Sequence, residues 1–172
     1  TSEDSANRFE LFYSADGGLE VGEDGLSGGE GWPLEVMDDF DAAIKQKFPH
    51  LTQLTALKVP AEAQERIDEL LRGQLALNVT NPGNQPVTAT GLQIPGVLDA
   101  LYTYDGPLGV EFGAEENTYR VWAPTAKNVT MRVPDPVEMI RDDATGVWSV
   151  TIPATPNVIY QYEVEVFVPS KG

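Results

Sequence analysis

The sequence contains no cysteine and a single histidine, His50, among its 172 residues. Without cysteine the chain has no disulfide framework and no thiolate nucleophile. One histidine cannot complete the usual zinc ligand sets, so neither a metal nor a cofactor is expected. The only histidine, His50, follows Pro49, so a Ser-His-Asp arrangement has little support. These absences exclude most nucleophilic and zinc-dependent catalysis.

Long apolar runs and positive charges are also scarce. No run approaches the about 20 apolar residues that a membrane-spanning helix needs, so membrane insertion is not expected. The 11 lysines and arginines stand against 27 aspartates and glutamates, which gives a net charge of −16. Such a charge repels phosphate backbones and anionic lipids and makes nucleic acid an unsuitable partner. A neutral polysaccharide is not repelled, although the charge is equally consistent with simple solubility.

The abundant carboxylates form no recognisable catalytic or calcium site. A glycoside-cleaving pair must flank a groove, with one pKa raised by burial. The acids here fall in expected turns or, like Glu163 and Glu165, on the outward face of a strand, opposite Tyr160 and Tyr162. The acidic clusters lack the spacing of a calcium loop; they are Asp38-Asp39-Asp41, Glu115-Glu116 and Asp142-Asp143. The chain is therefore not expected to be an enzyme by itself.

The first hundred residues predict a β-rich module with two short helices. Alternating apolar residues predict strands, the clearest of them over residues 8–14. Apolar residues at every fourth position predict a helix over residues 40–48, capped by Asp38 or Asp39. Pro60 is expected to open a second helix with an apolar stripe on one face.

Beyond Tyr104 the helical periodicity disappears and alternation takes over. Short apolar strands, separated by turns rich in glycine, asparagine and acid, predict a small antiparallel sandwich. We therefore expect a mainly β chain of two immunoglobulin-like antiparallel β-sandwich modules, the first with two short α-helices. The modules are expected to span residues 1–103 and 104–172.

Several sequence motifs then resemble those of a known family. "YDGPLGVEF…YRVWAPTAKNVTMRV", followed by "TGVWSVTIP" and "YQYEVEVFVPSKG", resembles carbohydrate-binding module family 48, a β-sandwich of starch-debranching enzymes in glycoside hydrolase family 13. Upstream, "FELFYSADGGLEV", "AAIKQKFPHLTQLTALKVP" and "GLQIPGVLDALYTYDGPLGV" resemble the domain before that module in pullulanases and limit dextrinases. "VWAPTA" occurs also in branching enzymes and isoamylases, whereas "KFPHL", "IPGVLD" and "YDGPLGV" in that order are specific to the pullulanase group.

The resemblance implies a function for the chain. Pullulanases hydrolyse α-1,6 branch points with two carboxylates on a (β/α)₈ barrel, which needs about 250 residues, more than this chain has. We therefore expect a non-catalytic N-terminal fragment, excised between Thr1 and Gly172, that stabilises or positions the catalytic barrel of the same parent chain and contacts α-glucan. The family also implies a secreted or cell-surface location. An independent starch- or glycogen-binding module and a generic β-sandwich interaction module remain as alternatives.

The three tryptophans are candidates for a sugar contact, because an aromatic face packs against the apolar face of a glucose ring. Trp148 shares the parity of the apolar residues on its strand and is expected in the core. Trp122 has the opposite parity from its apolar neighbours, and Trp32 lies in a glycine-rich loop. Trp32 and Trp122 are therefore the carbohydrate-contact candidates.

Trp122 is also the centre of an expected domain interface, together with Arg120 and Pro124. The family members that bind glycogen share a tryptophan pair and a lysine near the last strand. Here Glu163 stands on the matching strand, and no tryptophan follows Trp148. That departure favours a domain surface over a direct glucan site at Trp122.

Overall fold

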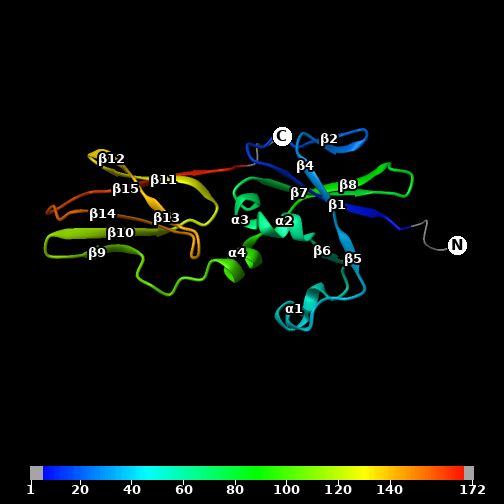
Figure 1. Ribbon diagram of the computed structural model, residues 1–172, viewed down its shortest axis with the longest axis horizontal. Helices are drawn as coiled ribbons and strands as arrows, with labels where there is room; N and C mark the ends of the chain where they lie inside the picture. Colours follow the sequence, from blue (N-terminus) through cyan, green and yellow to red (C-terminus); the bar gives the residue numbers. More distant parts are fainter. Residues whose placement is uncertain (1–5, 169–172) are drawn as a thin grey trace. The chain divides into compact units, whose positions relative to one another are not determined.

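The computed structural model describes residues 6–168 of the chain (Figure 1). Within this range, residues 6–70 and 74–92 form one compact unit, and residues 71–73 and 93–168 form a second. The module boundary expected after residue 103 stays a prediction. Both units are built mainly from antiparallel strands, which confirms the expected fold class. No helix of the described range is long and apolar enough to cross a membrane.

The main sheet of the first unit has the strand order β4-β1-β7-β8, and every pairing in it is antiparallel. Its strands are β1 (Arg8–Ser14), β4 (Glu30–Pro33), β7 (Gln74–Thr80) and β8 (Pro86–Gly91). The strand predicted over residues 8–14 is thus confirmed. Because side chains alternate along a strand, Leu11 and Tyr13 of β1 face one side and pack with Trp32, Ala63 and Leu70 in the core.

Short strands and helices complete the first unit. β2 (Glu20–Gly22) and β3 (Gly25–Ser27) form a hairpin, and β5 (Glu35–Met37) pairs with β6 (Ala56–Lys58). The second predicted helix is two helices, α2 (Ala61–Glu65) and α3 (Ile67–Leu70). A 3₁₀ turn, η2 (Pro49–Leu51), follows α1 (Ala42–Lys47).

Helix α1 confirms the first predicted helix but corrects its cap. The side chain of Asp41 accepts a hydrogen bond of 2.7 Å from the backbone N–H of Ala43, so Asp41 is the N-cap. Asp39 instead binds the ammonium of Lys45, which lowers the pKa of the Asp39 carboxyl. The cap predicted at Asp38 or Asp39 was wrong because a lysine six residues further along the chain is within reach of Asp39.

The second unit contains two antiparallel sheets, ordered β13-β14-β10-β9 and β12-β11-β15. The first sheet consists of β9 (Gly109–Phe112), β10 (Glu116–Trp122), β13 (Ile140–Asp142) and β14 (Val147–Pro153). The second consists of β11 (Ala126–Val133), β12 (Asp135–Glu138) and β15 (Gln161–Val166). Helix α4 (Pro95–Leu101) precedes them, and it was not predicted from the sequence because seven residues are too short to show a clear helical period.

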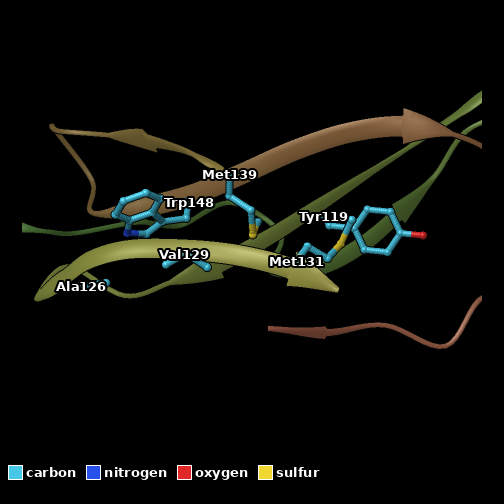
Figure 2. Close-up of a cluster of buried hydrophobic side chains, with 6 residues drawn as sticks. All are labelled: Tyr119, Ala126, Val129, Met131, Met139 and Trp148. Carbon is cyan, nitrogen blue, oxygen red and sulfur yellow. The ribbon is translucent and has the colours of Figure 1, made fainter. Parts of the chain in front are cut away.

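The core of this unit joins residues of both sheets (Figure 2). Its buried members are Tyr119, Ala126, Val129, Met131, Met139 and Trp148. The indole N–H of Trp148 donates to the carbonyl of Ala123 at 3.0 Å, which satisfies its one polar group as burial requires. The core position predicted for Trp148 is confirmed.

The last strand is only partly covered. Tyr160 and Tyr162 pack against the core, with edge-to-face contacts of 4.8 Å from Tyr119 to Tyr160 and 5.4 Å from Tyr160 to Tyr162 between ring centroids. Further along β15, Val164 and Val166 are each 40% exposed. The alternation correctly placed the tyrosines, whereas the two valines lie where the sandwich leaves one face of an edge strand open.

Tyr162 offers a test of this packing. Burial, followed by the neighbouring Tyr160, raises the pKa of Tyr162 to about 12. Since the folded state then prefers the neutral phenol, this stabilisation is complete below about pH 10 and is lost as the pH rises towards 12. In an ultraviolet absorbance titration of the six tyrosines, we expect Tyr162→Phe to remove the ionisation near pH 12. A Tyr162→Phe titration that keeps that step would place the raised pKa elsewhere.

Candidate functional site

A hollow in the second unit contains the residue to which the sequence drew most attention. It has a volume of about 280 Å³ and is lined by Asp99, Tyr102, Thr103, Tyr104, Leu108 and Trp122; we call it the Trp122 hollow. Its lining comes from the end of helix α4, from the segment leading to β9, and from the last residue of β10. Two separate parts of the chain thus meet there.

Trp122 is held firmly in this position. Its indole N–H lies 3.1 Å from the carbonyl of Tyr102 and 3.1 Å from the carbonyl of Thr145, and donates to both. The residue is nevertheless 36% exposed and does not belong to the core cluster. An aromatic ring whose polar atom is already satisfied, and whose surface remains partly open, is a preorganised contact for an apolar face.

Tyr104 adds a second aromatic ring to the hollow. Its hydroxyl donates to the carbonyl of Pro107 at 3.3 Å, and a Cβ added at Gly106 would lie 2.4 Å from the ring. The absence of a side chain at Gly106 therefore leaves the space that the ring occupies. With Leu108, and with the carboxylate and hydroxyl of Asp99 and Thr103, the hollow combines apolar surface with a few polar groups, as ligand sites do.

The other two interface candidates have different surroundings. Arg120, two residues before Trp122 on β10, binds the carboxylate of Glu111 on the neighbouring strand at 2.7 Å, and its side chain is 24% exposed. Pro124 is buried, and its Cβ would lie 2.6 Å from a Cβ added at Gly146. Pro124 therefore supports the loop behind Trp122, and only Trp122 and Arg120 of the three present side-chain surface.

A buried arginine that sequence reasoning missed connects these parts. The side chain of Arg141 is 6% exposed, and its guanidinium lies 5.5 Å from the centre of the Tyr102 ring. It donates to the carbonyl of Pro124 at 3.3 Å and pairs with Asp143. Arg141 thus ties the segment after α4 to the sandwich, and its only sequence signal was a cation between an apolar residue and an acidic turn.

Trp32, the other sugar-binding candidate, lies in the core of the first unit and is 7% exposed. The guanidinium of Arg66 lies 5.4 Å from its ring centre and also binds Glu30 at 2.7 Å and Glu69 at 2.9 Å. The hydrogen bonds that Arg66 donates to Glu69, and then to Glu30, raise the pKa of Arg66. A sugar ring could stack on Trp32 only after Arg66 had moved.

The described part of the chain presents surface for binding and no reactive constellation. Among residues 6–168, no three histidine, cysteine, aspartate or glutamate side chains are grouped so as to hold a metal ion. The Trp122 hollow combines aromatic rings with single polar groups, which suits contact with a ligand or a neighbouring domain. The fold and this hollow define the class of the chain as β-rich units with a candidate contact surface.

Comparison with known families gives the particular family. Residues 1–100 match the Pullulanase N2 domain, and the chain belongs to this family. Residues 107–171 match carbohydrate-binding module 48, the isoamylase N-terminal domain. These two matches confirm the resemblance on which the expected function was based, and neither of them is a catalytic domain.

Similar proteins support the same assignment. The chain is 35% identical over 173 residues to the chloroplastic pullulanase 1 of Arabidopsis thaliana, covering 93% of this chain and 17% of that protein. It is 34% identical over 117 residues to a pullulanase of Klebsiella pneumoniae, covering 62% of this chain and 10% of that one. The apo crystal structure of Klebsiella pneumoniae pullulanase superposes with a TM-score of 0.85 at 27% identity, over 94% of this chain and 18% of that chain. The chain thus spans less than a fifth of these relatives.

Proposed function

We propose that the chain is a non-catalytic N-terminal part of a pullulanase-type enzyme that cleaves α-1,6 branches of α-glucan. Its role is to stabilise and position the catalytic (β/α)₈ barrel of the same parent chain. Two adjoining accessory domains, matched over residues 1–100 and 107–171, support this assignment. The barrel and the debranching activity belong to the proposal, since the chain spans 17% of its chloroplastic relative.

The observation on which the contact proposal rests is the Trp122 side chain. It is fixed by two hydrogen bonds and is 36% exposed, so binding a partner there costs little further ordering of the side chain. Trp122 and Arg120, on the same face of β10, form the proposed docking surface. Pro124 supports it from beneath, where its carbonyl accepts from Arg141.

A second candidate function is direct binding of α-glucan. The aromatic lining of the Trp122 hollow and the match to carbohydrate-binding module 48 favour it. One structure of Klebsiella pneumoniae pullulanase that resembles this chain is a complex with maltotriose. In this alternative a glucosyl ring packs on Trp122 beside Tyr104, and Asp99 and Thr103 accept hydrogen bonds from its hydroxyls.

The variant Trp122→Ala separates the two functions. In the parent enzyme, loss of a docking contact worth about 1 kcal/mol is expected to lower the unfolding midpoint by no more than about 2 °C, because the chain is only 17% of such a relative; calorimetry measures this shift. In the 172-residue chain, loss of a stacking contact is expected to weaken maltoheptaose binding about tenfold. Phe112→Ala is the matched control, because Phe112 is 77% exposed and lies outside the hollow.

Each of the two measurements can contradict one function without touching the other. If Trp122→Ala leaves the thermal unfolding midpoint of the parent enzyme unchanged, docking through Trp122 is contradicted. If the maltoheptaose affinity of the Trp122→Ala chain equals that of the unmodified chain, or that of the Phe112→Ala control, the glucan contact at this hollow is contradicted. The location of the parent enzyme is also open to test: relatives include chloroplastic and bacterial pullulanases, and secretion stays a prediction.

A further inference from the structure

We propose that the first unit contains a separate binding site for a neutral sugar ring, of the kind an α-glucan would present. The choice of α-glucan rests on the proposed function, whereas the site itself is argued from the geometry. It is a hollow of about 490 Å³ on the outer face of the main sheet, within the about 300–1,000 Å³ typical of small-molecule sites. Its polar lining consists of Asn7, Arg8, Glu10, Asp24, Asn78, Thr80 and Asn84; we call it the polar hollow.

The strand register explains why polar residues gather there. Leu11 and Leu77 are paired across β1 and β7, and Leu11 faces the core; the preceding pair, Glu10 with Asn78, therefore faces the opposite side. The hairpin of β2 and β3 lies against this side, where β3 contacts β7 and β8. A sheet face covered by a hairpin is usually apolar. This one instead buries Asn78, which is 4% exposed.

Asn78 has an unsatisfied acceptor in this setting. Its side-chain nitrogen donates to a carboxylate oxygen of Glu10 at 3.1 Å, which fixes the orientation of the amide, because the reverse orientation would place two oxygens together. Its Oδ1 is buried and has no hydrogen-bond partner among residues 6–168. Buried acceptors are costly to leave unpaired, so this oxygen requires a donor from outside the described chain.

A glycine lies next to that oxygen. Gly25, the first residue of β3, has φ +104°, and a Cβ added there would lie 3.1 Å from Oδ1 of Asn78. Any other residue would therefore crowd the unsatisfied oxygen as well as strain the turn. Because Oδ1 is buried, the hydroxyl of a ligand or a water molecule can donate to it only if the β2–β3 hairpin shifts slightly at Gly25.

The surrounding groups select the ligand chemistry. Arg8 donates to Asn84 at 2.5 Å, while Glu10 and Asp24 supply two carboxylates. One cation against two anions disfavours a phosphate or sulfate, and the arginine disfavours a metal ion. Neutral hydroxyl groups can use both the donors and the acceptors. The apolar part of the lining, including Phe12, Leu26, Leu34 and Val36, matches the non-polar face of a sugar ring.

Nuclear magnetic resonance titration of the ¹⁵N-labelled 172-residue chain with maltoheptaose tests the site. We expect the side-chain amide signals of Asn78 and the backbone amide of Gly25 to shift in a saturable manner. Asn84→Gly removes one polar side chain at a position with φ +61° that glycine adopts readily, and is expected to weaken the affinity at these signals about three- to tenfold. Glu10→Gln, which keeps the size of the side chain, is expected to weaken it by a similar factor.

The matched control is Asn157→Gly, since Asn157 also has a positive φ, of 58°, belongs to the second unit and does not line the polar hollow. Its affinity at the Asn78 signals should equal that of the unmodified chain. Shifts confined to Trp122 and its neighbours would overturn this inference while leaving the glucan contact of the second unit intact. Asn78 and Gly25 signals that stay fixed at saturating maltoheptaose would mean that a water molecule alone satisfies Oδ1. Docking of the barrel is measured separately in the parent enzyme, so either idea can fail alone.

Discussion

Met131→Ala is expected to lower the free energy of unfolding of the second unit by about 2–5 kcal/mol. Met131 is fully buried between the two sheets, in contact with the cluster drawn in Figure 2. Truncation removes the transfer free energy of the side chain and leaves a cavity that neighbouring strands cannot easily fill. For a unit of this size, the midpoint of thermal unfolding should fall by at least about 10 °C, measured by circular dichroism or calorimetry.

Ile140→Ala is the control for this change. Ile140 is also a large apolar residue of the second unit, but it is 77% exposed, so its truncation should alter stability by no more than about 0.5 kcal/mol. Equal losses for the two variants would mean that Met131 does not lie in a close-packed core, and the arrangement of the two sheets would then have to be revised.

Gly146→Ala is expected to destabilise the second unit by about 3 kcal/mol, because two costs add. Gly146 has φ +69°, a conformation that costs an L-residue about 1–2 kcal/mol. A Cβ there would also lie 2.6 Å from the Cβ and 2.9 Å from the Cα of Pro124. Moving this turn displaces the carbonyl of Thr145, which accepts from the Trp122 indole. Denaturant unfolding should show the loss, with a change in tryptophan fluorescence of the folded state.

Gly109→Ala separates the steric part from the backbone part of that cost. Gly109 also has a positive φ, of 85°, but an added Cβ would meet nothing within 4 Å. It should therefore lose only the about 1–2 kcal/mol of the conformational term. If Gly146→Ala proved no more harmful than Gly109→Ala, Pro124 would not be packed against the turn as described.

The sequence predicted the parts of this chain that depend on alternation. β1 and the core position of Trp148 follow from a period of two, because one face of each strand must be buried. Tyr119 and Trp122 were correctly assigned to different environments by the same argument, since Tyr119 is 2% exposed and Trp122 is 36% exposed.

The candidate sites were predicted only in part, because they depend on contacts between distant segments. Trp122 could be selected by parity, but its neighbours in the hollow come from helix α4 and the segment after it, which showed no periodicity. Trp32 was chosen for its glycine-rich surroundings, and sequence offers no sign that Arg66, more than thirty residues later, covers its ring. The polar hollow was missed because Asn78 looked like an ordinary polar interruption of an apolar strand.

The open valines of β15 have a consequence for solubility. β15 lies at the margin of its sheet, where unpaired backbone groups can template the addition of a strand from another molecule. Val164 and Val166 would make that pairing attractive, but Glu163 and Glu165 alternate with them along the strand. Glu163 is paired with Arg132 of the neighbouring strand, so it is chiefly the charge of Glu165 that would oppose edge-to-edge pairing of two molecules. The acidic residues of β15 thus oppose strand addition at this margin of the sheet.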